Sequence, residues 1–451
     1  MTKQLLEQQQ KGSELGKLLP VFVIVLVDLL GLTIIVPLLP LYAASFGATP
    51  VMIGLLGAAY PLMQALGAPL LGRLSDRLGR KPILMASQLG TFVSFMLLGF
   101  ANALPMLFVA RIINGLSGAN IAAAQAVITD STSEENRTQG LALIGAAFGI
   151  GFTIGPLLAF AALALSGNSY QAPAFAAAAF SLLSFLLTAF WLKESLPPKM
   201  RGKAKREALS LRAVAHALRH PVIGFLLLLM FAQQFIFGGM EHLLALFTLS
   251  RLGFGAQMNA VLFLFIGLIT VIMLGGVIRV WSRQHSDRWI ISVGLATLAV
   301  GMLLAALTPE IPPPWYSRAE MLAELQRSAE RALRVALPSE AQKGWLGMAW
   351  IFVAMIPASV GGAVLAPTIN SAITKRVAPT EVGGMLGVSA SMVSLANASA
   401  PLIGSAIFQL IGPSAPFALG GVVLVVLLVL VNMRLTSAPT STVPVDTRLA
   451  H

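Results

Sequence analysis

The 451-residue chain is 57% hydrophobic and only 11% charged, and its mean hydropathy is +0.83. Soluble domains are roughly 45–50% apolar, so this composition excludes an ordinary soluble domain and predicts an all-α membrane protein whose outer surface contacts lipid. The chain has no cysteine, which excludes disulfides, thiol nucleophiles and cysteine-ligated metals.

Long apolar stretches, divided at charges, prolines and glycines, predict twelve membrane-spanning helices. A bilayer core about 30 Å thick needs about 20 apolar residues per helix. The first 18 residues are polar and no small-residue cleavage site follows them, so the first apolar stretch is expected to remain as a helix. The expected helices lie at 19–42, 51–71, 83–101, 105–129, 140–165, 172–193, 221–249, 256–280, 289–308, 344–371, 383–410 and 414–434.

The connections between these helices alternate in charge. Those at 43–50, 101–104, 166–171 and 411–413 contain no charged residue. By the positive-inside rule, the basic connections and both chain ends are expected in the cytoplasm, with the protein in the cell inner (plasma) membrane. The net charge of +12 then reflects membrane orientation and no nucleic-acid partner is expected. The basic connections contain Arg73, Arg77, Arg80 and Lys81, then eight Lys and Arg against two Glu within 193–220, then Arg279, Arg283 and Arg288, and then Lys375 and Arg376.

The two halves of the chain resemble each other weakly. At one fixed offset, GPLLA at 155–159 aligns with APLIG at 400–404, and the small-residue segment 139–155 aligns with 384–400. This match predicts two pseudo-symmetric six-helix bundles derived from one ancestral unit. The expected layout is a cytoplasmic tail at 1–18, a first bundle at 19–193, a basic cytoplasmic linker at 194–220, a second bundle at 221–435 and a cytoplasmic tail at 436–451.

One connection departs from the charge alternation, the insertion at 309–343. It contains five Arg and Lys and five Glu, and apolar residues recur at helical spacing from Tyr316 to Leu337. This pattern predicts an amphipathic helix on the outer surface. Because its charges balance and it has no binding motif, a solvated cap without a substrate role is the simplest interpretation.

The sequence GRLSDRLGRK at 72–81 concentrates five charges between two apolar stretches. A basic residue alone would suffice for membrane orientation, so the fixed arrangement indicates a further role. The glycines and Pro82 are expected to end one helix and start the next. Asp76 can accept hydrogen bonds from a helix N-terminus, and Arg80 can bridge to Asp130 at the cytoplasmic end of the fourth helix. We expect a conformational latch formed by Gly72, Asp76, Arg77, Gly79, Arg80, Lys81 and Asp130.

Three ionisable residues are expected inside the membrane, where a charge costs roughly 2.5–3.5 kcal/mol. Asp28 lies near the middle of the first helix, Arg111 lies within the fourth, and Glu241 is the only acidic residue deep in a second-half helix. They are the candidates for proton coupling. Each also has a structural alternative: a permanent hydrogen bond for Asp28, backbone carbonyl partners for Arg111 and a gate-closing bond for Glu241.

Small and amide residues provide the remaining candidates. Gly145, Gly149, Gly151, Gly155 and Pro156 predict a smooth groove for a close helix contact, with a kink at its end, or ordinary small-residue packing. Amides within the apolar stretches are candidates to line a substrate cavity, although Gln125 also fits a helix-to-helix hydrogen bond. These cavity candidates are Gln64, Asn114, Gln125, Gln233, Gln234 and Asn370.

Four motifs together resemble the major facilitator superfamily, and within it the tetracycline and multidrug proton-antiporter branch. They are the 72–81 loop, DLLGLTIIVPLLP at 28–40, RIINGLSGAN at 111–120 and GAAFGIGFTIGPLLA at 145–159. The resemblance covers nearly the whole chain. It implies two bundles that rock around a central cavity, a latch of Asp76, Arg80 and Asp130, a proton-coupling role for Arg111, and a fifth-helix glycine groove that seals the bundle interface.

One position departs from the tetracycline exporters. Where that pattern has an acidic residue in the third helix, this chain has Ser94, which argues against a metal-chelated tetracycline as substrate.

The expected function is proton-coupled export of small hydrophobic or cationic compounds by a monomer in the lipid bilayer, with protons and a small molecule as partners and no cofactor or metal. A sugar or metabolite permease that works by symport or facilitated transport is the alternative. An enzyme is not expected, because no predicted span contains a His-x-x-x-His, a cysteine or two carboxylates within one helical turn. The one His-x-x-x-His of the chain, at 216–220, lies in the basic linker. Neither 193–220 nor 436–451 is long enough to be the soluble domain of a membrane sensor.

Overall fold

The computed structural model describes residues 2–118, 120–132, 137–197, 199, 201, 215, 217–326, 334–378 and 381–435. Helices account for nearly all of the regular structure in these ranges, and no strand occurs among them. Most of the predicted linker at 194–220, the whole tail at 436–451 and residues 327–333 of the insertion lie outside the described residues.

The helices of the first half begin at the N-terminus and end at Trp191. Their bounds are α1 Thr2–Ile35, α2 Leu39–Ser45, α3 Pro50–Leu78, α4 Arg80–Gly99, α5 Leu104–Ser117, α6 Asn120–Ser131, α7 Arg137–Leu165 and α8 Gln171–Trp191. The helices of the second half are α10 Pro221–Leu252, α11 Ala256–Ile272, the π-helical turn η2 Met273–Val277, α12 Ile278–Gln284, α13 Asp287–Ala306, α14 Arg318–Gln326, α15 Leu346–Thr374, α16 Val382–Leu410 and α17 Ala415–Arg434.

Eleven segments of the described chain are long and apolar enough to cross a membrane, and each corresponds to a predicted span. Their ends agree within about four residues, except that Pro50–Leu78 continues beyond the predicted end at 71. The remaining predicted span, 105–129, corresponds to two shorter helices, α5 and α6, which are separated near Gly118. The first span is also interrupted, because the helical hydrogen-bond pattern breaks at 36–38, beside Pro37 and Pro40.

Three helix ends differ from the expectations. The helix α1 begins at Thr2, so the segment expected as a polar tail is helical. The helix α3 continues through Gly72 and ends at Leu78. Of the two glycines in this loop, Gly72 keeps a helical conformation and Gly79 has a positive φ, of 113°. In the insertion, the described helix α14 ends at Gln326, and residues 334–337 are not helical.

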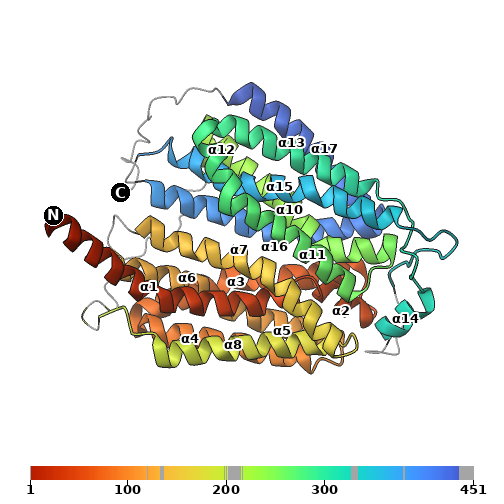
Figure 1. Ribbon diagram of the computed structural model, residues 1–451, viewed down its shortest axis with the longest axis horizontal. Helices are drawn as coiled ribbons and strands as arrows, with labels where there is room; N and C mark the ends of the chain where they lie inside the picture. Colours follow the sequence, from red (N-terminus) through yellow and green to blue (C-terminus); the bar gives the residue numbers. More distant parts are fainter. Residues whose placement is uncertain are drawn as a thin grey trace.

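Each half packs mainly within itself. In the first, α1 contacts α7 and α8, and α4 contacts α5 and α8; in the second, α13 contacts α15 and α17, and α10 contacts α15 and α16. The two groups lie side by side in Figure 1, joined by contacts of α3 with α16 and of α7 with α11. Small residues permit these crossings. A Cβ added to Gly54 would lie 2.6 Å from the Ser405 side chain, and a Cβ added to Gly267 would lie 2.6 Å from the Phe152 carbonyl oxygen.

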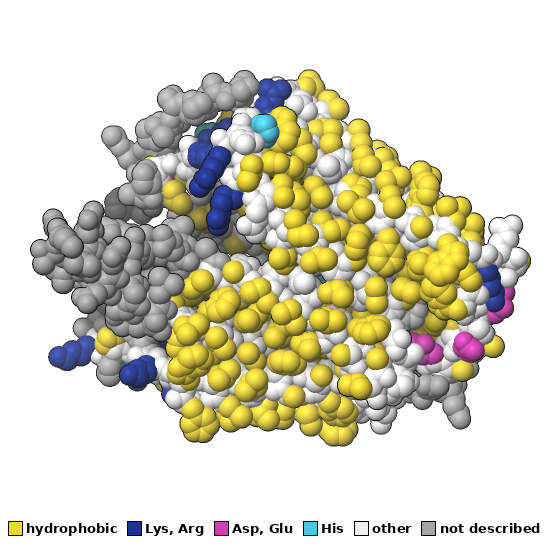
Figure 2. Space-filling model, in the orientation of Figure 1, with side chains coloured by type: hydrophobic (Ala, Val, Ile, Leu, Met, Phe, Trp, Pro, Cys, Tyr) yellow, Lys and Arg dark blue, Asp and Glu magenta, His cyan; other side chains and the backbone are white. Residues whose placement is uncertain are grey.

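The surface has the distribution expected for a membrane protein. Apolar side chains cover the middle of the face in Figure 2, whereas Lys and Arg gather toward the end where both termini lie and Asp and Glu lie at the opposite end, near α14. Large apolar side chains such as Leu70, Phe190 and Val426 are more than half exposed, which is favourable in contact with hydrocarbon.

The α13–α15 crossing gives a test of this packing. A Cβ at Gly301 would lie 2.6 Å from the Cβ of Ala358, and the neighbouring contact is with backbone that cannot move aside. Gly301→Ala is therefore expected to destabilise the protein by about 1–3 kcal/mol through overpacking. The midpoint of thermal unfolding in detergent measures the effect. Gly383→Ala in α16, where a Cβ would meet no described residue within 4 Å, is the control; equal midpoints for the two variants would contradict this packing.

Candidate functional site

A buried charge cluster occupies the turn between α3 and α4. Arg80 begins α4, and its guanidinium donates from Nη1 to Asp76 Oδ1 at 2.5 Å and from Nε to Asp130 Oδ2 at 2.9 Å. Asp76 and Arg80 are each about 6% exposed. Asp130 lies near the end of α6, so one planar guanidinium joins three first-half helices.

The other predicted members of this cluster differ in exposure. Gly79 makes the turn with its left-handed φ, and Lys81 donates from Nζ to the Ala189 carbonyl at 2.7 Å. Arg77 is exposed at the end of α3, and Gly72 is buried one turn earlier. The side chains of Arg80 and Lys81 contact α3, α6 and α8, so the cluster fixes the neighbouring ends of α3, α4, α6 and α8 relative to each other.

Glu194 is part of this cluster although the sequence did not single it out. Its carboxylate accepts hydrogen bonds from the backbone N–H groups of Arg80 at 2.9 Å and Lys81 at 3.3 Å, so it caps the N-terminus of α4 from the segment after α8. Ser195 donates to Asp130 Oδ2 at 3.3 Å. The signal for this role in the sequence is an acidic residue directly after the sixth predicted span, although its charge alone is equally typical of a linker.

The glycine run of α7 faces two helices. Thr33 of α1 donates to the Gly151 carbonyl at 2.9 Å, and a Cβ at Gly155 would meet Thr33. Gly149 instead faces α11, where a Cβ would lie 3.8 Å from Val271, and a Cβ at Gly145 would meet no described residue within 4 Å. Pro156 is buried inside α7. The groove therefore contacts α1 in its own half and α11 in the other half through different glycines.

A polar cluster lies inside the first half, around Arg111 of α5. The Arg111 guanidinium lies 4.7 Å from the ring centre of Tyr60 on α3, and both Arg111 and Asp28 of α1 are close enough to act electrostatically on Tyr60. Gln64 donates to the Tyr60 hydroxyl at 3.0 Å and to the Gly118 carbonyl at 2.9 Å. Arg111 Nε and the amide nitrogen of Asn114 are buried and have no hydrogen-bond partner among the described residues.

In the second half, Glu241 and His242 lie on α10. His242 Nδ1 lies 3.2 Å from the Gly238 carbonyl oxygen, and a Cβ on Gly57 of α3 would lie 2.7 Å from the imidazole ring, so His242 contacts the first half. Glu241 is partly buried, and no hydrogen bond or ion pair to another described residue accompanies it. The described residues contain no group of three or more acidic or His side chains placed to hold a metal ion.

The amide candidates form two separate sets in the second half. Gln233 donates to Gln234 Oε1 at 3.4 Å, and Gln234 donates to Asn397 Oδ1 of α16 at 2.9 Å. Asn370 on α15 accepts from Ser389 of α16 at 2.7 Å. Gln125 is exposed on α6 and lies with neither set. The structure thus brings Gln233 and Gln234 together and leaves Asn370 and Gln125 apart.

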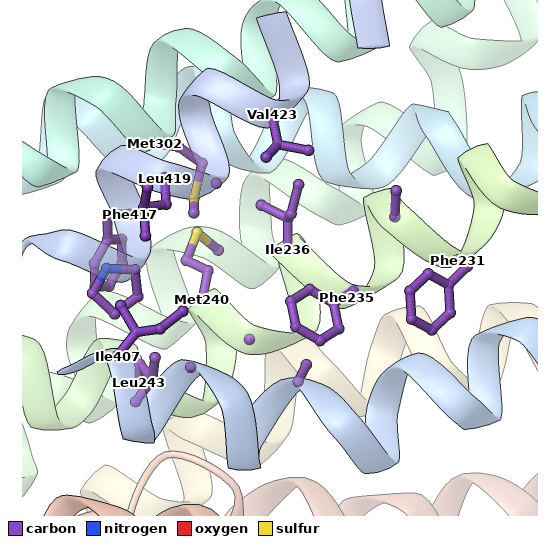
Figure 3. A pocket seen from close by; sticks show the side chains of 16 residues that line it. Phe231, Phe235, Ile236, Met240, Leu243, Met302, Ile407, Phe417, Leu419 and Val423 are labelled. Atoms are coloured by element: carbon purple, nitrogen blue, oxygen red, sulfur yellow. The ribbon is translucent and has the colours of Figure 1, made fainter. Parts of the chain in front are cut away.

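An apolar pocket of about 310 Å³ lies between α10, α13, α16 and α17 (Figure 3). Phe235, Met240 and Phe417 are among its lining side chains, and Leu419 and Val423 of α17, each nearly half exposed, also border it. None of the polar cavity candidates lines this pocket. The sequence did not single it out as a pocket, because its walls come from four helices far apart in the chain.

Comparison with known proteins identifies the family. The family model of the Major Facilitator Superfamily matches residues 21–322 and 341–449. Among curated proteins, the class B tetracycline resistance protein of Escherichia coli is 28% identical over 394 residues, which cover 86% of this chain and 87% of that protein. Human major facilitator superfamily domain-containing protein 10 is 27% identical over 447 residues, with 88% of each chain covered.

Solved structures share the fold. The human organic anion transporter MFSD10 aligns over 93% of this chain and 99% of its own, with a TM-score of 0.62 and 24% identity. The D-xylose–proton symporter aligns over 94% of this chain and 99% of its own, with a TM-score of 0.68 and 14% identity. The motifs, the helical architecture and the length of these matches agree. The chain belongs to the Major Facilitator Superfamily, a family of transporters, and within it to the tetracycline and multidrug branch.

Proposed function

We propose that this chain is a proton-driven exporter of small hydrophobic or cationic compounds. It works as a monomer in the cell inner membrane, with both termini in the cytoplasm. The helices α5 and α6 together form the fourth of its twelve membrane spans. Two six-helix groups, 19–193 and 221–435, rock against each other so that a central site faces first one side of the membrane and then the other.

The observation that carries this proposal is the presence of ionisable side chains within the membrane in both halves. Arg111 is only 6% exposed, cannot lose its proton and lies over the Tyr60 ring, while Glu241 is partly buried on the facing half of the molecule. Because a charge in hydrocarbon is costly, such groups in an otherwise apolar chain favour a role in ion movement. Asp28 and Glu241 are the proposed proton carriers, and Arg111 adjusts the proton affinity of its neighbours.

The arrangement of the two halves supports alternating access. Near α14 they make close contacts: Val51 of α3 donates to Gln409 of α16 at 3.1 Å, and Gly54 lies against Ser405. At the end near the termini, Gly145 of α7 and Gly383 of α16 have nothing within 4 Å among the described residues. These contacts fit a state in which the site is closed toward the outside and accessible from the cytoplasm.

The proton gradient provides enough energy for export. One proton that crosses a membrane potential of 100 mV releases about 2.3 kcal/mol. A tenfold concentration ratio corresponds to about 1.4 kcal/mol, so one proton per molecule supports roughly fifty-fold accumulation before any pH difference contributes.

The proposed substrate class rests on the relatives and on the side chain at position 94. The likeness to tetracycline resistance proteins supports a drug-sized substrate. Ser94, however, is buried in α4 where the pattern of the tetracycline exporters has an acidic residue. Without that carboxylate, an apolar or weakly cationic molecule without a chelated metal is the better fit. A screen of toxic-compound resistance in a pump-deficient host identifies the compounds for the transport measurements.

The amide pair Gln234–Asn397 favours a second candidate, a sugar or metabolite permease of the same family, because amides can bind hydroxyl groups. Uptake of a labelled polar solute by intact cells, unaffected by hydrophobic drugs, would favour this alternative. Export of hydrophobic compounds without any such uptake would exclude it.

The paired substitution Asp28→Asn with Glu241→Gln tests the proton carriers. Neither amide can carry a proton at these positions, so vesicles that contain the variant and a pH-sensitive dye should show no proton release when an expelled compound is added. Glu320→Gln, an exposed carboxyl on α14, is the control and should behave as the unmodified protein. Gradient-driven export that survives in the double variant would overturn the proposed mechanism.

The conformational role of the 72–81 cluster is tested by Arg80→Lys. Lysine keeps the charge, but it lacks the planar fork that contacts Asp76 and Asp130 together. Because a hydrogen bond to a charged group contributes about 1.5–3 kcal/mol, we expect the initial rate of export to fall about tenfold or more at equal protein level. Arg77→Lys changes an exposed arginine of the same turn and should have no effect; equal rates in the two variants would refute the latch.

A further inference from the structure

The insertion at 309–343 is fastened to the second half of the molecule. Arg251, in the last turn of α10, forms an ion pair with Glu310 and donates to the Thr308 carbonyl at 3.0 Å. Lys343 donates to the Tyr316 carbonyl at 2.5 Å and so joins the two ends of the insertion. These contacts attach the insertion to the outer ends of α10 and α13.

The same insertion also contacts the first half through α14. This helix packs against α2, and its apolar residues Met321 and Leu325 are 9% and 1% exposed, in one core cluster with Tyr42 and Phe46. The helix is therefore not a solvated cap, because its apolar face is covered by a helix of the other half. Figure 1 shows α14 beside α2, at the end of the molecule away from both termini.

A polar contact accompanies this apolar one. The hydroxyl of Tyr170, which precedes α8, donates to Glu324 Oε1 of α14 at 3.4 Å. Tyr170 is 3% exposed and stacks on Tyr42, with ring centres 5.5 Å apart, and Tyr42 donates to the Leu98 carbonyl at 3.0 Å. The donor is therefore held rigidly within the first half. Burial and the Glu324 carboxylate raise the pKa of Tyr170 well above its ordinary value, so the hydroxyl keeps its proton.

Glu324 also lies close to the second half beyond the insertion. A Cβ at Gly255, the residue before α11, would lie 3.1 Å from Glu324 Oε1. The carboxylate thus stands between Tyr170 of the first half and the N-terminal end of α11 in the second, where the helix dipole favours a negative charge.

We propose that α14 is an outer strap that holds the outer ends of the two halves together and makes outward opening the disfavoured step; this rests on the proposed alternating-access function. When the outer ends separate, α14 remains with the second half. The packing of α14, with its buried Leu325, against α2 is then lost, and Glu324 loses the Tyr170 hydroxyl. Because these contacts exist in one state only, they shift the equilibrium between the two states.

The chain without cysteine allows a direct test. Leu165→Cys at the end of α7 and Leu410→Cys at the end of α16 place spin labels on the outer ends of the two halves, at positions 90% and 81% exposed. Pulsed electron paramagnetic resonance in lipid nanodiscs then gives the distance distribution between the labels, without added substrate. A longer distance reports the outward-open population.

Leu325→Ala is expected to raise the outward-open population by about tenfold, because it removes most of the apolar contact. Tyr170→Phe, which keeps the ring stacking and removes only the donor, is expected to raise it by a smaller factor of about threefold. Glu320→Gln, exposed on the same helix, is the matched control and should leave the distribution unchanged.

Two outcomes would overturn the strap. Unchanged distance distributions in both Leu325→Ala and Tyr170→Phe would show that α14 does not restrain opening. An equal rise in Glu320→Gln would show a general disturbance of the insertion. Since the measurement needs neither a proton gradient nor a transported compound, failure of the proposed export activity would leave its result intact, and the two failures can be told apart.

Discussion

The cost of placing charge in hydrocarbon governs this molecule. With 57% hydrophobic residues, the chain concentrates most of its described charges at the two ends of the helices, and few remain between them. Arg111 over the Tyr60 ring is the clearest case. A permanently charged guanidinium at this depth favours nearby groups that carry negative charge, and it raises the free energy of any state in which those groups are neutral. In the proposed export cycle, this electrostatic coupling is what links the binding of a proton to the conformation of the surrounding helices.

The second constraint is the close approach of helix backbones. Because lipid offers no hydrophobic drive for helix association, the crossings depend on small residues that let neighbouring helices make many contacts. Gly301 at Ala358 within the second half, and Gly54 at Ser405 between the halves, have no room for a side chain. Crossings within a half fix its shape, whereas crossings between the halves must separate if the molecule opens on the outer side. Close contacts at small residues thus stabilise the shape of each half, and between the halves they are the contacts that break on opening.

The two ends of the molecule are organised differently. At the end near the termini, Arg80 joins Asp76 and Asp130 with hydrogen bonds from one guanidinium, and all three residues belong to the first half. At the other end, the contacts of α14 extend from the second half to the first through Leu325 and Glu324. Only contacts that differ between two states change their populations. The proposed strap joins both halves and meets this condition when they separate, whereas the charge cluster meets it only if its hydrogen bonds break in the other state.

The sequence alone determined that this is a helical membrane protein and where most of its apolar helices lie, since the length of an apolar stretch depends on local composition and on the thickness of the bilayer. It also indicated the Arg80–Asp130 pair, because both residues lie next to the ends of predicted spans. Only the tertiary structure decided which helices and side chains contact each other. The capping of α4 by Glu194 and the packing of α14 on α2 involve partners that are distant in sequence. The break between α5 and α6 reflects a local balance of packing against helix propensity. Periodicity identifies the apolar face of a helix, but the helix that covers this face is fixed by three-dimensional packing.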